Sequence, residues 1–225
     1  MSFLNIFSNF FLRFSKKEPP TSINNVLIQS PSKENNIKEK TSVGSSPTPL
    51  SRNGNMSFEK ALAFTLRWEG GYVNHPSDPG GETNKGIIKK EYDKYRTEKS
   101  LPLRSVKEIE DTEVKDIYEN KYWKVGHCDV MRDKLAIVHF DTVVNTGITQ
   151  GAKFLQRCLK VKDDGVIGAG TLKALADSNQ DSLIPDYLAQ RRAFYQKIVQ
   201  VNPKLQVFLK GWMNRVDSLE KVVAA

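Results

Sequence analysis

The chain has 225 residues, enough for one domain of ordinary size with extensions or for two small domains, but its apolar content of 39% is low for one compact globule. We therefore expect part of the chain not to fold. The net charge of +8 and the pI of about 9.3 favour a polyanionic partner, and with no nucleic-acid-binding motif we expect an anionic membrane or an acidic cell-wall polymer rather than specific nucleic-acid binding.

The N-terminal region divides into two segments. Residues 1–17, MSFLNIFSNFFLRFSKK, place phenylalanines near one face at helical spacing, which is typical of an amphipathic segment that contacts a membrane surface or a partner. The alternative is a tail that is disordered or docks on a helix. The segment lacks the basic start and the small-residue cleavage site of a signal peptide, and it is too short and polar to span a bilayer. Residues 18–55 are rich in Pro, Ser, Asn, Lys and Thr, which predicts a disordered linker.

Helical patterns begin after the linker. Residues 58–68 carry apolar side chains on one face, with Ser57 as the expected N-cap. Further helices are expected near 88–98, 105–110, 112–124, 133–145, 149–159, 169–178, 182–201 and 204–222. Ser105 and Glu108 form a potential capping box, Gly147 predicts a helix end, and Asn202 before Pro203 predicts a helix start. The fold class is therefore mainly α.

The stretch EGGYVNHPSDPGGETNKGI, residues 69–87, interrupts this helical pattern. Its five glycines and two prolines exclude a regular helix or a central strand. The turn sequences Pro79-Gly80 and Asn84-Lys85-Gly86 allow at most a small β-ribbon within residues 70–90. The stretch also concentrates carboxylates, so two interpretations are open: a turn-rich surface loop or an active-site loop.

Glu69 and Asp78 have the features of an acid–base pair. Glu69 follows Trp68 at the expected end of the first core helix, where an aromatic neighbour and the negative end of the helix dipole both raise a carboxyl pKa. Asp78 lies in a polar loop and is expected to stay ionised. Two carboxyls with divergent pKa values are typical of glycoside hydrolysis, and the Thr83 hydroxyl could orient a water molecule. A Glu followed by an Asp in a β-turn is nevertheless common in proteins of any function.

The sequence contains no pattern of residues that indicates a metal site or a cofactor site. Cys128 and Cys158 form no CxxC pattern, so two buried thiols and a single disulfide both remain open. The three histidines do not fall at metal-ligand spacing. We expect no metal and no cofactor.

Several motifs resemble the glycoside hydrolase family 108 muramidases of phages and bacteria, also called the secretion-activator family. The strongest is RWEGGYVNHPSDPGGETNKGI (67–87), in which a Glu precedes Gly-Gly-Tyr, Asp-Pro-Gly-Gly, a Thr and a Gly with an aliphatic residue. FDTVVNTGITQGAKFLQRCL (140–159) and GWMNRV (211–216) are also similar to the family. DGVIGAGTLKAL (164–175) resembles its predicted peptidoglycan-binding part. The resemblance covers about residues 57–222.

The resemblance implies a lysozyme-like α-helical domain over residues 56–225, of which about 147–225 corresponds to the peptidoglycan-binding part. It also implies cleavage of the glycan strand at N-acetylmuramic acid, with Glu69 as the catalytic general acid. Asp78 and Thr83 follow Glu69 in the order of the Asp and Thr of phage lysozymes, although the spacing to Thr83 is one residue shorter.

Other residues have two interpretations each. Tyr72 either stacks on a sugar or packs the loop, and Asn145 either bonds a sugar or caps a helix C-terminus. Trp123 and Trp212 are expected in the core. Residues 164–175 either bind wall peptide or, as we favour, close the fold.

The sequence thus predicts a monomeric peptidoglycan N-acetylmuramidase that is made in the cytoplasm and acts on the bacterial wall, in the periplasm or outside the cell. Two alternatives differ in mechanism or class. A lytic transglycosylase would need one Glu and no Asp partner, and a wall-binding or secretion-assisting protein would need neither.

Overall fold

The computed structural model describes residues 53–74 and 81–224. The predicted amphipathic segment 1–17 lies outside the described residues, as do most of the predicted linker and Asp78. The first described helix, α2 (Asn53–Leu66), begins within the last three residues of that linker. The mainly α-helical, lysozyme-like fold with a small β-ribbon is confirmed.

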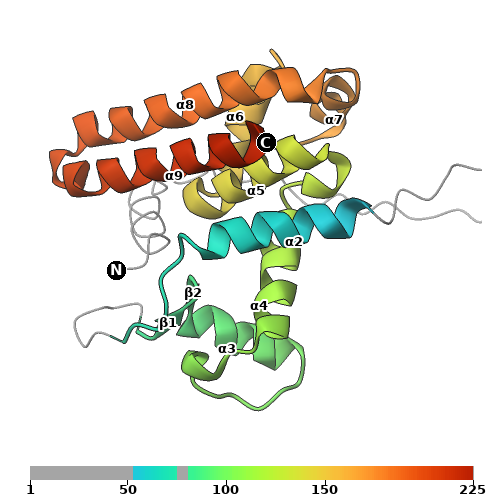
Figure 1. Cartoon of the computed structure of the whole chain (residues 1–225). Coiled ribbons are helices and arrows are strands. Elements are labelled where there is room, and N and C mark those ends of the chain that lie inside the picture. The colour runs from blue at the N-terminus through green and yellow to red at the C-terminus, as the bar shows by residue number, and fades with distance from the viewer. Residues whose placement is uncertain (1–52, 75–80, 225) are drawn as a thin grey trace, which may run out of the picture.

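Figure 1 shows α2 crossing the middle of the molecule between two groups of elements. One group contains β1 (Thr83–Asn84), β2 (Ile87–Ile88), α3 (Lys89–Glu98) and α4 (Asp111–Tyr118). The other group contains the remaining helices, which are α5 (Asp133–Thr146), α6 (Ile148–Cys158), α7 (Ala169–Ala176), α8 (Gln180–Val201) and α9 (Gln206–Ala224). Glu69 lies three residues after the end of α2, so the predicted acid stands in the segment of chain that leads from α2 into the first group.

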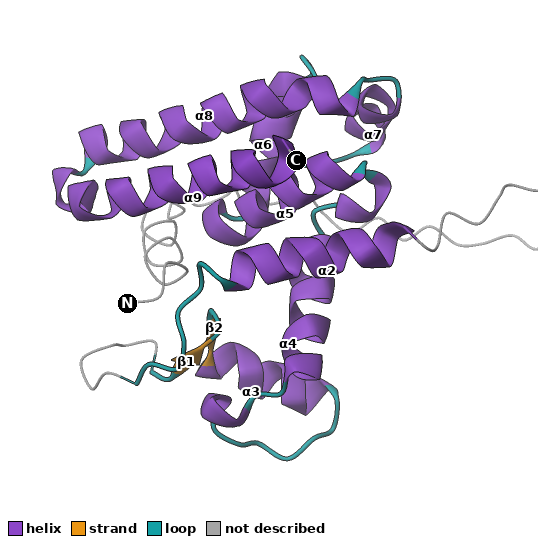
Figure 2. Cartoon of the chain, viewed as in Figure 1, coloured by secondary structure: helices purple, strands orange, loops and turns teal. Residues whose placement is uncertain are grey.

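The predicted hairpin is confirmed, and Figure 2 shows it as the small orange ribbon beside α3. Thr83 pairs with Ile88 and Asn84 with Ile87 in an antiparallel register. The two turn residues, Lys85 and Gly86, have φ angles of 48° and 77°. Positive φ at both central residues is the geometry that joins two twisted strands through a two-residue turn. The Asn-Lys-Gly sequence therefore sets the position of the residues just before it, including Thr83.

Helix α5 is the centre of the second group because every residue from Leu135 to Thr146 is buried. A helix that is buried on all sides needs close neighbours on all sides. Gly151 of α6 supplies one such contact, since a Cβ at this position would lie 2.4 Å from Val143 Cγ1. Gly147, with φ 91°, ends α5 as predicted and begins α6 one residue later.

Two predictions about helix starts are wrong. Ser57 is not the first N-cap because α2 begins at Asn53, and its hydroxyl instead donates to Asp133 at the start of α5. The capping box is formed by Glu110 and Glu113 rather than by Ser105 and Glu108. Ser105 does cap the short 3₁₀ helix Val106–Glu108 by accepting from the backbone N–H of Lys107. In both cases a longer or later helix forms because tertiary contacts outweigh the local signal.

The predicted helix start at Asn202 and the predicted burial of two tryptophans are confirmed. Asn202 accepts from the N–H of Lys204 at the 3₁₀ turn Pro203–Leu205, which leads into α9. Trp123 and Trp212 are both buried. Trp123 packs edge-on against Phe140 with ring centroids 5.6 Å apart. Cys128 and Cys158 are buried free thiols, so the disulfide alternative is excluded.

His139 on α5 predicts how stability depends on pH. Its ring is fully buried, its Nδ1 lies 2.8 Å from the Tyr187 hydroxyl, and burial lowers its pKa to about 3. The unfolded chain binds a proton at this residue below pH ~6.5, whereas the native chain does not. Native stability is therefore full above pH ~6.5 and falls as the pH drops towards 3, with a loss of about 2 kcal/mol from this residue at pH 5.

We expect His139→Gln to remove this contribution. Urea unfolding at pH 7 and pH 5 should show a difference in unfolding free energy that is about 2 kcal/mol smaller in the variant than in the parent chain. His127→Asn, at a partly exposed position with φ 55°, is the control and should keep the parent's difference. An equal pH dependence in His139→Gln and the parent would show that His139 is not the group responsible.

Candidate active site

Glu69 lies three residues beyond the end of α2. Its backbone N–H still donates to the Thr65 carbonyl at 3.2 Å, and the chain then leaves the helix at Gly70. Its side chain is completely buried and its Oε1 accepts from Arg215 Nη1 at 3.0 Å. Arg215 is on α9, 146 residues further along the chain. The fold thus brings the first and last described helices together at the predicted acid.

Arg215 also binds Asp141 of α5. Its Nη2 donates to Asp141 Oδ1 at 2.7 Å, and its Nε lies 3.1 Å from the same oxygen. Arg191 of α8 donates to Asp141 Oδ2 at 2.7 Å, and Thr65 of α2 donates to Oδ1 at 3.1 Å. Asp141 is therefore held by three helices without contact with solvent. We call Glu69, Asp141, Arg191 and Arg215 the buried charge cluster.

The pKa of Glu69 is raised above the usual value for a glutamate. Burial is the largest cause because it disfavours the charged carboxylate, and the nearby charge of Asp141 acts in the same direction. Arg215 opposes both by stabilising the carboxylate. The sequence predicted the direction correctly, but from Trp68 and the helix dipole. The structure identifies overall burial and Asp141 as the named causes.

One oxygen of Glu69 is not used by the cluster. Oε2 has no hydrogen-bond partner among the described residues, although it is buried. A protonated carboxyl carries its hydrogen on an oxygen that can donate it. Since Oε1 already accepts from Arg215, the geometry leaves Oε2 as the oxygen that can carry the proton.

The hairpin holds Thr83 near the same junction. Thr83 exchanges two backbone hydrogen bonds of 2.8 Å with Val73, which ties the strand to the segment that follows Glu69. Its side chain is buried, and its Oγ1 has no hydrogen-bond partner among the described residues. Asp78, the third predicted catalytic residue, lies in residues 75–80 and outside the described part of the chain.

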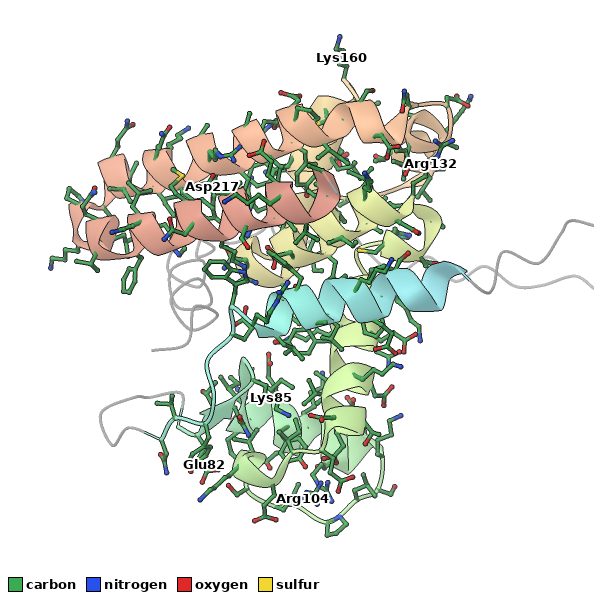
Figure 3. All side chains as sticks on the ribbon, in the orientation of Figure 1. Glu82, Lys85, Arg104, Arg132, Lys160 and Asp217 are labelled. Atoms are coloured by element: carbon green, nitrogen blue, oxygen red, sulfur yellow. The ribbon has the colours of Figure 1, made fainter. Side chains whose placement is uncertain are left out.

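Neighbouring residues anchor the hairpin. Glu82 Oε2 accepts from the Ser105 hydroxyl at 2.6 Å, and Asn84 donates to the Val106 carbonyl at 3.2 Å. The Tyr118 hydroxyl of α4 donates to the Lys85 carbonyl at 2.8 Å. Figure 3 labels Glu82 and Lys85 on this hairpin, below α2 and well separated from Asp217 on α9. These bonds fix Thr83 without using its hydroxyl.

The two predicted substrate-binding residues differ from each other in how far they are exposed. Tyr72 is 38% exposed, and Lys107 Nζ lies 5.6 Å from the centre of its ring. Asn145 is 1% exposed, inside α5, and its Oδ1 accepts from the Tyr195 hydroxyl. The capping alternative for Asn145 is wrong because Gly147 is the residue that ends α5. Asn145 Nδ2 has no hydrogen-bond partner among the described residues.

Three members of the buried charge cluster, Asp141, Arg191 and Arg215, were not identified from the sequence. Asp141 lies in FDTVVNTG and Arg215 in GWMNRV, two stretches whose resemblance was noted without assigning these residues a role. A charged residue inside an otherwise apolar helical face was the available signal, since such residues are rarely buried without a partner. Arg191 gave no such signal because Arg192 follows it.

The described residues contain neither a cluster of metal ligands nor a membrane-spanning helix. No group of three or more His, Cys, Asp or Glu side chains is arranged to hold a metal ion in residues 53–74 and 81–224. Over the same ranges, every helix is too short or too polar to cross a bilayer.

Comparison with known proteins identifies two consecutive regions. Residues 62–147 match the family model described as glycosyl hydrolase 108, and residues 150–217 match one described as a predicted peptidoglycan domain. The structure is similar to that of SagA from Brucella abortus, with 31% sequence identity and a TM-score of 0.60. That similarity covers 76% of this chain and 95% of the Brucella chain. No curated protein sequence matches this chain.

The buried charge cluster predicts that two arginines, each bound to two carboxylates, differ greatly in how much they contribute to the free energy of unfolding. Arg215→Met leaves Asp141 buried with a single arginine, and we expect a loss of about 3–5 kcal/mol in unfolding free energy. Arg192→Met is the matched control because its partners, Asp217 and Glu220, are both on the surface. We expect this variant to change the unfolding free energy by no more than about 1 kcal/mol. Urea denaturation measures both, and equal losses would refute the role given to Arg215.

Proposed function

Because the chain belongs to the glycosyl hydrolase 108 family, we propose that it is an N-acetylmuramidase, which hydrolyses the bond between N-acetylmuramic acid and N-acetylglucosamine in peptidoglycan. The observation that carries this proposal is the buried Glu69 carboxyl with a raised pKa. A general acid must hold its proton near the working pH, and burial of a carboxyl achieves this.

In the proposed reaction, Glu69 donates its proton from Oε2 to the glycosidic oxygen as the bond to the muramic acid C1 breaks. Arg215 keeps Oε1 in place and stabilises the carboxylate that remains after proton transfer. Water supplies the hydroxyl that ends on C1 and the proton that restores Glu69. General acid catalysis of this kind contributes about 10²–10⁴-fold to the rate.

The roles of Asp78 and Thr83 are proposals that follow from this scheme. Asp78 stabilises the positive charge on the sugar ring, activates the water molecule or attacks C1 as a nucleophile. The separation of the two carboxyls decides among these, since about 5–5.5 Å suits a nucleophile and about 6.5–9.5 Å leaves room for water. Thr83 is proposed to orient water or substrate through its Oγ1, which no other described residue engages.

Substrate contacts are proposed for Tyr72 and Asn145. The exposed ring of Tyr72 suits stacking on a sugar, and it lies next to Val73, which pairs with Thr83. Asn145 offers fewer atoms for contact with a sugar than Tyr72 does. Its Oδ1 is occupied by Tyr195, so only Nδ2 remains to donate to a sugar oxygen.

The proposed place of action is the bacterial cell wall, outside the cytoplasm, with a monomer as the acting unit. The match of residues 150–217 to a predicted peptidoglycan domain supports peptidoglycan as the partner. The net charge of +8 suits an anionic wall polymer.

Replacement of the proposed acid is the central test. Glu69→Gln keeps the size of the side chain but cannot donate a carboxyl proton, and we expect its activity on purified peptidoglycan to fall by about 10²–10⁴-fold. Glu59→Gln is the control, since Glu59 lies on α2, the helix that precedes Glu69, is half exposed and pairs only with Lys115 among the described residues. It should retain the parent's activity.

Mass spectrometry of the digested wall separates this proposal from its alternatives. Reducing N-acetylmuramic acid ends are expected from hydrolysis. Ends with a 1,6-anhydro ring would establish a lytic transglycosylase, and a parent chain that binds the wall without cleaving it would establish a binding protein. Glu69→Gln with the parent's activity would exclude Glu69 as the acid.

For the N-terminal region we propose that residues 1–17 contact a membrane or a partner and that the following segment, up to the start of α2 at Asn53, is a tether. A tether adds reach but no catalytic group. Deletion of residues 1–52 should therefore leave hydrolysis of isolated walls within about twofold of the full chain, because the buried charge cluster and hairpin remain. Loss of activity, with the far-UV circular dichroism of a folded helical protein retained, would contradict the tether role.

A further inference from the structure

A groove lies along α6 and α8, away from the residues assigned to catalysis. Its volume is about 720 Å³. On each of these two helices the lining residues follow one another at helical spacing. Those on α6 are Gln150, Phe154 and Arg157. Those on α8 are Asp186, Gln190, Ala193, Phe194, Lys197, Ile198 and Val201. The stripe on α8 runs from residue 186 to 201, which is about 22 Å at 1.5 Å per residue.

The groove has an apolar floor and a charged rim. Phe154 and Phe194 pack edge-on with ring centroids 5.6 Å apart, and the exposed Ala193 adds a small side chain to the lining. Lys197 is exposed and, unlike Arg157, which pairs with Asp163, makes no ion pair with any other described residue. Asp186 is exposed on the same helix. The groove thus offers an unpaired cation, a carboxylate and an apolar surface along one line.

Gln190 adds an unused hydrogen-bond acceptor. Its Nε2 donates to Cys158 Sγ at 3.1 Å and to Asp186 Oδ2 at 3.3 Å. Its Oε1 has no hydrogen-bond partner among the described residues. This oxygen is itself buried, so it becomes available to an N–H donor of a bound peptide only when the Gln190 side chain turns towards the groove.

These features suit a short zwitterionic peptide better than a sugar chain. A neutral glycan needs exposed aromatic faces and many polar partners, whereas Phe154 is 1% exposed, Phe194 is only half-buried, and five of the ten lining residues are apolar. A peptide of five residues extends to about 17 Å, which fits within the stripe on α8. Its carboxylates would meet Lys197, an amino group would meet Asp186, and its alanine methyls would lie on the apolar floor.

We propose that this groove binds the stem peptide of peptidoglycan. The inference rests on the proposed function, because it takes the wall as the substrate. All lining residues fall within residues 150–217, the region that matches a predicted peptidoglycan domain. Between residues 150 and 217 there are 11 Lys or Arg and 6 Asp or Glu; Arg191 and Arg215 are buried against Asp141 and Glu69, and the remaining 9 cations against 6 anions give a net charge of +3 that favours a peptide rich in carboxylates.

The groove and the catalytic residues use different faces of α8. Arg191 and Tyr195 are fully buried against the cluster and Asn145, whereas Lys197 and Ala193 are exposed. Binding of peptide can therefore be measured on full-length Glu69→Gln, where no glycan is cleaved. Failure of the groove proposal is then distinguishable from failure of the muramidase proposal.

The test uses the tetrapeptide L-alanyl-γ-D-glutamyl-meso-diaminopimelyl-D-alanine and the neutral sugar chain tetra-N-acetylchitotetraose as separate probes. Titration into ¹⁵N-labelled full-length Glu69→Gln should shift amide resonances of α6 and α8 with the tetrapeptide but not with the sugar. Lys197→Glu should weaken tetrapeptide binding at least fivefold, and Ala193→Trp, which fills the space above the floor, should abolish it. Lys210→Glu, at an exposed site on α9 outside the groove, is the matched control for charge and should bind like the parent.

Each other outcome would overturn the proposal. Shifts in α6 and α8 with the sugar alone would assign the groove to glycan. Tetrapeptide binding that is equally weakened by Lys197→Glu and Lys210→Glu would reflect overall charge rather than the groove. No binding by the parent chain at millimolar tetrapeptide would exclude a peptide site here, even if Glu69→Gln proves inactive on whole peptidoglycan.

Discussion

The side chain of Arg215 is the contact on which the rest of the site depends. It joins Glu69, which follows the first described helix, to Asp141 at the centre of α5, and it comes from the last helix. The regions that match two separate family models, residues 62–147 and 150–217, therefore share one set of buried charges. The second region is therefore not structurally independent of the first, because without it Asp141 would lose both of its arginines.

Within the buried charge cluster, Glu69 receives fewer hydrogen bonds from arginine than Asp141 does. Asp141 takes two close bonds from Arg215 and another from Arg191, and these guanidinium groups hold the pKa of Asp141 below its usual value despite complete burial. Glu69 receives one bond of 3.0 Å and its pKa is raised. Two carboxyls that share one arginine thus differ in ionisation because Asp141 has the larger share of positive charge.

Much of the fold could be predicted from the sequence because its signals are local. The turn Asn84-Lys85-Gly86 and the helix end at Gly147 depend on backbone preferences that one or two residues carry. The partners of Glu69 could not be predicted in the same way. Asp141 and Arg215 lie 74 residues apart, and nothing local states that they meet. Asn145 shows the same limit, since its burial against Tyr195 depends on how α8 packs.

Stability alone does not explain why such a cluster is retained in the core. Replacing a buried ion network with well-packed apolar side chains is often neutral or stabilising, because removing charges from water costs more than their attraction returns. What an apolar core cannot provide is a carboxyl whose pKa is raised by burial while an arginine holds one oxygen. Arg191 and Asp141 are fully buried, so their contribution is to hold Arg215 in position and to leave it only partly available to Glu69. On this argument the core of α5, α8 and α9 is shaped as much by the ionisation of one glutamate as by packing.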